Sequence, residues 1–201
     1  MPPEPGAAEA PAVFLDRDGV LSEEVFFPAT GRFEAPMVPE ALALRPGAGA
    51  AVRRLAEAGF PLFLVSNQGA YARGHTTLAA LWAVHRRFLE LLAAEGAGFT
   101  DCFYAFGHPE GVVRHFSGVS LARKPSPYFL LVAGARHGLD LGRSWMVGDQ
   151  ATDVACGQAA GVRTILVDNP HSGDRTLGAR PDFRAADIAA AAALILAARA
   201  G

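Results

Sequence analysis

Short, continuous apolar runs separated by longer stretches of helical pattern constrain this chain more than any other feature of its sequence. Runs of this length without polar interruption are typical of strands that are buried on both faces, as in a parallel sheet. The clearest runs cover residues 12–15, 61–65, 144–147 and 163–167, with 99–106 as a further strand candidate.

Helical patterns lie between these runs. They cover residues 48–58, 76–92, 125–137 and 151–160, and residues 185–200 form a predicted terminal helix. Thr76 or Thr77 can cap the second of these helices. In the third helix, we expect Tyr128, Phe129, Leu131 and Val132 to face inward, by their helical spacing.

Strands that alternate with helices predict βαβ units and a parallel sheet covered on both sides. Right-handed crossovers then give an α/β fold, a three-layer doubly wound sheet of the Rossmann-like kind. A length of 201 residues, 51% of them hydrophobic, suits one such domain over residues 12–201, without a second, cap-like domain. Residues 1–11 are rich in Pro, Ala and Glu, lack the pattern of a signal peptide, and are predicted to be a disordered tail.

Composition narrows the choice of partners. A formal net charge of -2 gives no electrostatic reason to expect a nucleic acid or an anionic membrane. Two cysteines in a chain of this size do not make a disulfide scaffold, so a reducing cytoplasm is expected. The terminal Ala-rich stretch is too short and too weakly apolar to cross a bilayer. A monomer and a small homo-oligomer both remain open.

Polar residues follow the predicted strands at the points where the apolar runs stop. Ligands of doubly wound sheets bind beyond these carboxyl ends, so residues there are expected to share one site. The residues are Asp16 and Asp18, then Ser66 and Asn67, then Asp149 with Asp153 four residues on, together with Lys124 at the start of a helix.

The aspartates predict a magnesium site and a nucleophile. In an extended backbone, Asp16 and Asp18 point the same way while Arg17 points elsewhere. Asp149 adds a third carboxylate, and such crowding is repulsive unless a hard cation such as Mg²⁺ lies among the oxygens. Asp16 can then attack a phosphate ester, while Asp18 protonates the leaving oxygen and later activates water.

Lys124 is the single lysine of a chain that has 17 arginines. An ammonium group is a compact point charge, which suits a crowded place between a phosphoryl group and Asp16 better than the fixed fork of a guanidinium. Ser66 and the backbone amides after it can hold the non-bridging phosphate oxygens. The chain is therefore expected to be a phosphatase that forms a phospho-aspartate.

Each of these features alone has an ordinary interpretation as a turn, a helix cap or a surface charge. Their joint placement at the strand ends favours function. A phospho-acceptor signalling domain is the main rival from another class, because it also combines aspartates, a hydroxyl and a lysine around Mg²⁺. An aspartate two residues after the acceptor favours turnover over storage, and a catalytically idle binding protein is the remaining alternative.

Four segments resemble the motifs of the haloacid dehalogenase (HAD) superfamily. They read FLDRDGV at 14–20, LVSNQ at 64–68, ARKPSP at 122–127 and MVGDQATD at 146–153. The resemblance implies that Asp16 is the nucleophile and Asp18 the general acid and base. It also implies that Mg²⁺ is bound by Asp16, the Asp18 carbonyl and Asp149, with Asp153 steadying the metal's waters.

Shorter segments of the chain read DRDG at 16–19, NQ at 67–68, ARG at 72–74 and RKP at 123–125. They resemble the motifs of one branch of the superfamily, which holds heptose bisphosphate and histidinol-phosphate phosphatases. The proteins of this branch have no large cap domain. The resemblance implies a small phosphorylated metabolite as substrate, most simply a phosphorylated sugar. It also implies that Arg123 contacts the substrate. Arg73 is a weaker candidate for substrate binding and is equally suited to pinning a loop.

The chain departs from this branch at its zinc loop. The four positions that usually hold cysteine or histidine ligands are Ala105, Gly107, Ser120 and Ala122, so no structural zinc is expected. The segments 23–47 and 107–123, which follow no clear period, are expected to wall the pocket. Departures in the first segment and at Gln150 leave the exact substrate open.

Overall fold

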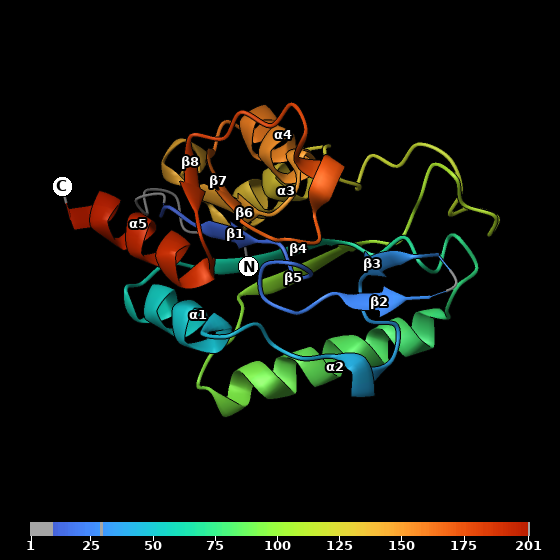
Figure 1. The fold of residues 1–201 in the computed structure, drawn as a ribbon. Helices are drawn as coiled ribbons and strands as arrows, with labels where there is room; N and C mark the ends of the chain where they lie inside the picture. The colour runs from blue at the N-terminus through green and yellow to red at the C-terminus, as the bar shows by residue number, and fades with distance from the viewer. Residues whose placement is uncertain (1–9, 29, 201) are drawn as a thin grey trace.

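The chain folds around a six-stranded sheet in which every neighbouring pair of strands is parallel, shown in Figure 1. The structure is a computed structural model that describes residues 10–28 and 30–200. The strand order is β5-β4-β1-β6-β7-β8. The strands are β1 (Val13–Leu15), β4 (Leu62–Asn67), β5 (Asp101–Ala105), β6 (Trp145–Gly148), β7 (Arg163–Val167) and β8 (Phe183–Ala185).

The first strand lies at the centre of the sheet, between β4 and β6. Leu15 pairs in register with Leu64 of β4 and with Val147 of β6, and all three are fully buried. The chain moves outward from β1 to β4 and β5, and then returns to the other side of β1 to form β6. This reversal beside β1 is the place where a doubly wound sheet binds its ligands.

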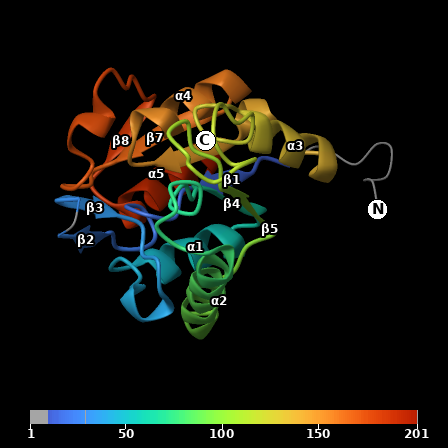
Figure 2. The ribbon, with the colours of Figure 1, turned by 90° about the vertical axis from the view of Figure 1, so that its right-hand side faces the viewer.

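Helices cover both faces of the sheet, with α3 and α4 on one side and α1, α2 and α5 on the other (Figures 1 and 2). They are α1 (Ala48–Glu57), α2 (Leu78–Ala94), α3 (Tyr128–His137), α4 (Ala151–Ala160) and α5 (Ile188–Ala200). Side chains that alternate along β1 enter two separate cores. Val13 packs with Phe88 of α2, whereas Phe14 packs with Leu130 of α3. The predicted three-layer α/β fold is therefore confirmed, and no described helix has the length and apolar character needed to cross a membrane.

The predicted helices differ from the observed ones mainly at the starts of α5 and α3. Helix α5 begins at Ile188 and not at residue 185, because Ala185 belongs to β8. Helix α3 begins at Tyr128, three residues later than predicted, and it buries Leu130 and Ala133. The expectation that Tyr128 and Leu131 face inward is wrong, because each side chain is 47% exposed. Residues 128–133 are six consecutive apolar residues, which allow more than one inward stripe, so periodicity alone does not fix the buried face. In α2, Thr77 is the cap, and its hydroxyl accepts a hydrogen bond from the Ala80 amide at 3.1 Å.

The segment 23–47 contains structure that its sequence pattern does not predict. Strands β2 (Val25–Phe27) and β3 (Arg32–Glu34) form an antiparallel hairpin, and η1 (Pro39–Ala41) is a short 3-10 helix. Phe26 lies opposite Phe33, with ring centroids 5.3 Å apart. Strands of three residues are too short for alternation to show in a sequence. The hairpin and the 107–123 loop lie beyond the same end of the sheet (Figure 1).

The 107–123 loop is irregular, as predicted, yet it is anchored. The amides of Val112 and Val113 donate to the Ala72 carbonyl at 2.7 and 3.0 Å, and the Phe116 ring packs edge-on against Tyr71. The predicted tail falls mostly outside the described residues. Of its last residues, Ala10 forms a bridge with Leu139.

Candidate active site

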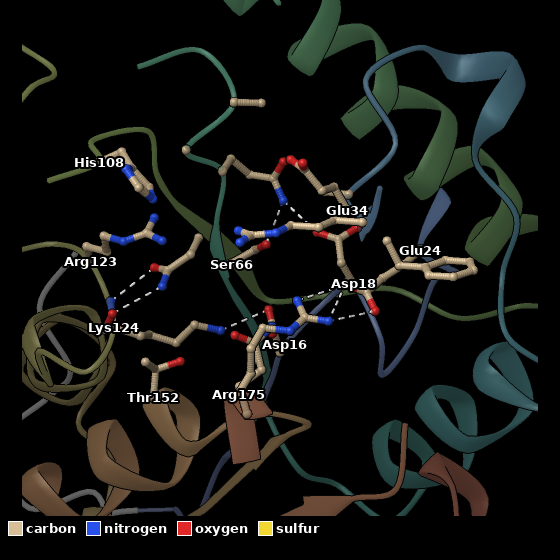
Figure 3. A pocket seen from close by; sticks show the side chains of 18 of the residues that line it. Asp16, Asp18, Glu24, Glu34, Ser66, His108, Arg123, Lys124, Thr152 and Arg175 are labelled. Carbon is tan, nitrogen blue, oxygen red and sulfur yellow. Dashed lines mark hydrogen bonds and ion pairs between the residues drawn. The ribbon is translucent and has the colours of Figure 1, made fainter. Parts of the chain in front are cut away.

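A cavity of about 950 Å³ opens at the carboxyl edge of the sheet, beyond β1 and β4. Its floor is formed by the ends of these strands and by the start of α4, and its walls by the β2–β3 hairpin and the 107–123 loop. Figure 3 shows polar and charged side chains from these segments directed toward one space. The nine predicted site residues all lie at this edge, and all but Asp149 line the cavity itself.

Lys124 lies at the floor of the cavity, where two acids surround its ammonium group. Its Nζ lies 2.9 Å from Asp16 Oδ1 and 2.7 Å from Asp153 Oδ1, and it donates to the Val65 carbonyl at 2.8 Å. Burial favours the neutral amine, but the two carboxylates hold the pKa of Lys124 above its ordinary value. The lysine is therefore a fixed positive charge beside the predicted nucleophile.

Asn67 holds Lys124 in place. Its Oδ1 accepts from the Lys124 amide at 3.0 Å, and its Nδ2 donates to the Lys124 carbonyl at 3.2 Å. Both ends of the Asn67 amide are thus used on the backbone of the lysine. Asn67 also lines the cavity, so the predicted contact with substrate stays a prediction.

The carboxylates of Asp16, Asp149 and Asp153 form a group of metal-binding geometry, each with one oxygen within 4.8 Å of the others. Burial raises the pKa of Asp16 to about 7, although Lys124 opposes this shift. Burial and the nearby Asp16 raise the pKa of Asp149 to about 6. Asp149 Oδ1 is buried and has no hydrogen-bond partner among the described residues. Crowded, buried carboxylates with an unpartnered oxygen fit a hard divalent cation.

Asp18 lies beside this group, and its carboxylate is held by three donors. Its Oδ1 accepts from Arg17 Nε at 3.0 Å and from Ser22 Oγ at 3.1 Å, and its Oδ2 accepts from Gln68 Nε2 at 2.6 Å. Gln68 also donates to Ser66 Oγ at 2.9 Å. The side-chain oxygens of Asp18 are thus oriented by protein groups, which leaves its backbone carbonyl as the implied metal ligand.

Sequence reasoning missed the contributions of Arg17 and Gln68. The expectation that Arg17 points away from the site is wrong, because its buried side chain donates from Nε to Asp18 Oδ1 at 3.0 Å. Gln68 was noted only as part of a motif, although its amide joins Asp18 to Ser66. An arginine inside the first motif was a possible signal, because an arginine beside a buried strand needs a carboxylate partner.

Arg123 and Arg73 lie on one side of the cavity but differ in their partners. Arg73 Nη2 lies 2.7 Å from Glu34 Oε2, so it joins the loop after β4 to the hairpin. Arg123 Nη1 donates to the Gly107 carbonyl at 3.3 Å, and the guanidinium has no carboxylate partner among the described residues. Burial and the nearby Arg73 lower the pKa of Arg123. A substrate anion would compensate this charge.

The two ends of the 107–123 loop meet where the related branch usually holds zinc. A Cβ on Gly107 would lie 3.1 Å from the Ser120 Cβ. Cys102 in β5 is half-buried, and burial raises the pKa of its thiol to about 12. The absence of structural zinc stays a prediction.

Known proteins are similar to this chain in sequence and in fold. A family model described as HAD-hydrolase-like matches residues 121–191. The D-glycero-D-manno-heptose-1,7-bisphosphate 7-phosphatase of Thermosynechococcus vestitus is 43% identical over 191 residues, covering 90% of this chain and 93% of that protein. The D-glycero-beta-D-manno-heptose-1,7-bisphosphate 7-phosphatase of Rhodopseudomonas palustris is 35% identical over 156 residues, covering 78% and 82%.

A solved structure of a heptose bisphosphate phosphatase is also similar to this chain. The D,D-heptose 1,7-bisphosphate phosphatase of B. bronchiseptica, complexed with magnesium and phosphate, has a TM-score of 0.79 and 28% identity, and the match covers 94% of this chain and 99% of that chain. Fold, site and relatives place the chain in the class of phosphatases built on a doubly wound sheet. It belongs to the haloacid dehalogenase superfamily, which confirms the resemblance of its four motifs.

Proposed function

We propose that this chain is a magnesium-dependent phosphatase that hydrolyses a phosphorylated sugar through a phospho-aspartate on Asp16, with heptose bisphosphate as the first candidate. The observation that carries the proposal is the position of Asp16. Its carboxylate lies 2.9 Å from the Lys124 ammonium on one side and within the Asp149–Asp153 carboxylate group on the other. The relatives' names support the sugar bisphosphate.

In the first half of the reaction, an oxygen of Asp16 attacks phosphorus, and the bond from phosphorus to the sugar oxygen breaks. Asp18 gives its proton to that oxygen, so the sugar leaves as an alcohol. Lys124 lies close enough to Asp16 to offset the negative charge of the phosphoryl group as it is transferred. In this proposal Ser66 and the amides after it hold the non-bridging oxygens.

In the second half, Asp18 takes a proton from water, and the resulting hydroxide attacks the phosphorus of the phospho-aspartate. The Asp16–phosphorus bond breaks, which releases inorganic phosphate and restores the Asp16 carboxylate. The three donors on Asp18 hold its carboxylate in one orientation for both proton transfers. Its link through Gln68 to Ser66 ties the acid to the group that holds the phosphate.

In this proposal the cation would be held by Asp16, Asp149 and the Asp18 carbonyl, and Asp153 would steady its waters. When bound, Mg²⁺ would neutralise the crowded acids and polarise the phosphoryl group. Support comes from the raised pKa values of Asp16 and Asp149 and from the unpartnered Asp149 Oδ1. A cytoplasmic site of action is part of the proposal, supported by two free cysteines, Cys102 and Cys156.

The test is phosphate release from a panel of phosphorylated metabolites that includes heptose 1,7-bisphosphate, other sugar phosphates and histidinol phosphate. We expect heptose bisphosphate to give the highest kcat/KM, and EDTA to stop turnover until Mg²⁺ is restored. Asp16→Asn should lower kcat by at least about 1,000-fold, because it removes the nucleophile. Asp168→Asn is the matched control, since this exposed acid follows β7 but lies outside the cavity.

Circular dichroism and the melting temperature should show that Asp16→Asn still folds. Full turnover by this variant would contradict the assignment of the nucleophile. A higher kcat/KM for histidinol phosphate than for any sugar phosphate would contradict the proposed substrate while leaving the chemistry in place.

A further inference from the structure

Glu24 is a buried acid that the proposed chemistry does not use. Its side chain is 3% exposed and lies directly before β2, in the wall of the cavity. Its Oε1 accepts from Nη1 and Nη2 of Arg175, each at 3.0 Å. Its Oε2 accepts from Asn169 Nδ2 at 2.9 Å. Figure 3 shows Glu24 and Arg175 beside Asp16 and Asp18.

Asn169 connects this acid to the carboxylate group at the floor. Its Nδ2 carries two hydrogens, and it also donates to Asp149 Oδ2 at 2.8 Å. Ser172 Oγ donates to the same Asp149 oxygen. With two donors on Oδ2, the Asp149 side chain is fixed so that its other oxygen, Oδ1, is the unpartnered one.

The backbone leaves room for this connection. Gly19 has a φ of +83°, and a Cβ at this position would overlap both Asp149 Oδ2 and Asn169 Nδ2. A side chain there would therefore displace the hydrogen bond between these two residues. The glycine after Asp18 thus keeps open the space in which Asn169 reaches Asp149.

We propose that Glu24 and Asn169 are positioning residues that hold Asp149 in the orientation that binds Mg²⁺. The proposal rests on the proposed function, because it takes Asp149 as a ligand of the cation. Glu24 contributes in two ways: it orients the Asn169 amide, and its charge offsets Arg175, which otherwise would place an uncompensated cation near the metal.

The test measures Mg²⁺ binding by isothermal titration calorimetry on the full chain without substrate. Groups behind a metal ligand typically change metal affinity by about 10- to 100-fold, so Asn169→Ala and Glu24→Gln should each raise the Kd for Mg²⁺ at least about 10-fold. Phosphate release should show the same effect as a shift in the Mg²⁺ concentration required, with kcat recovered at saturating Mg²⁺. A loss of folded protein would instead lower activity at every Mg²⁺ concentration.

Glu34→Gln is the matched control. It makes the same substitution in the other hairpin carboxylate, which pairs with Arg73 at 2.7 Å but has no hydrogen bond to Asn169 or Asp149. Its Kd for Mg²⁺ should stay within about twofold of wild type. Ser172→Ala is a milder second variant that removes only a hydroxyl, and it should weaken Mg²⁺ binding even if Asn169→Ala does not fold.

Two outcomes would overturn the proposal. One is a Kd within twofold of wild type for a folded Asn169→Ala or Glu24→Gln variant. The other is an equal loss of Mg²⁺ affinity in Glu24→Gln and Glu34→Gln. Such a result would show that Mg²⁺ binding depends on how firmly the hairpin is held, and not on the hydrogen bonds from Glu24 through Asn169 to Asp149. The calorimetry uses no substrate, so it tests this proposal separately from the proposed function. If the wild-type chain bound Mg²⁺ as expected but released phosphate from no compound, only the proposed function would be rejected.

Discussion

The floor and the walls of the cavity are built in different ways. On the floor, the side chains of Lys124 and Asp153 are 2% and 1% exposed. The Lys124 ammonium group lies within 3 Å of a carboxylate oxygen of both Asp16 and Asp153. The walls include more exposed contacts, such as the Glu34–Arg73 ion pair and the stack of Phe33 on His171. We infer that the chemistry is fixed mainly at the edge of the sheet and that the choice of substrate depends mainly on the wall loops. Glu24 is the exception, because it lies in the wall but is buried and bonded to Asn169.

We expect a large loss of activity from Lys124→Arg, a substitution at the floor of the cavity. The substitution keeps the charge, but the planar fork is larger and cannot place a point charge between Asp16 and Asp153. Losing one well-placed charge of this kind typically costs about 100- to 1,000-fold in kcat, which steady-state phosphate release would measure. Overpacking of the buried site should also lower the stability by about 1–3 kcal/mol in urea unfolding.

The control for this change is the reverse exchange at the surface. Arg136 is 59% exposed and pairs with Asp101 at 3.1 Å, so Arg136→Lys should leave both kcat and stability nearly unchanged. Turnover by Lys124→Arg at the wild-type rate would show that the floor tolerates any cation, and the argument from the single lysine would be wrong.

A smaller effect should come from the wall, through Phe33→Ala. Phe33 is half-buried, lines the cavity and stacks on His171 with ring centroids 3.6 Å apart. An aromatic pair contributes about 0.5–1.5 kcal/mol, and its loss should leave this wall of the cavity less well ordered. The sugar phosphate should then bind more weakly, and its KM should rise by roughly 3- to 10-fold. The kcat should change little, because Phe33 has no part in the proposed bond-making steps.

Phe63→Ala gives the matched comparison within the core. Phe63 is fully buried in β4 and stacks on Phe14, with ring centroids 5.3 Å apart. Its truncation should lower stability by about 3–5 kcal/mol and leave the KM of the folded fraction unchanged. If Phe33→Ala instead lowered the melting temperature as much as Phe63→Ala, the hairpin would belong to the structural core, and the distinction between floor and wall would fail.

The same division explains what could be predicted from the sequence. Apolar runs buried on both faces mark β1, β4, β6 and β7 plainly, and parallel strands bring their carboxyl ends to one edge, so the residues that follow them converge. The gathering of Asp16, Lys124 and Asp149 was therefore predictable. Nothing comparable marks the β2, β3 and β8 strands, because three residues are too few for a pattern to show in the sequence.

Hydrogen bonds between distant polar residues were also beyond sequence reasoning. The contact between Glu24 and Asn169 joins residues 145 positions apart, and no local pattern indicates it. Arg73 shows the same limit, because the sequence left it open between substrate contact and loop pinning. Its ion pair with Glu34 favours pinning, yet its place in the cavity keeps the other role open.

The smallest expected effect concerns zinc, whose removal should change nothing. Elemental analysis of the purified chain should find almost no zinc, and a zinc-selective chelator should leave both kcat and KM as they are in the presence of Mg²⁺. The reason is that the 107–123 loop is anchored without metal, by the Val112 and Val113 amides on the Ala72 carbonyl and by Phe116 on Tyr71. Phe116→Ala should therefore speed hydrogen exchange in this loop while β4 stays protected. A full equivalent of zinc per chain would show that other residues have replaced the missing ligands, and that this wall is held as firmly as the floor.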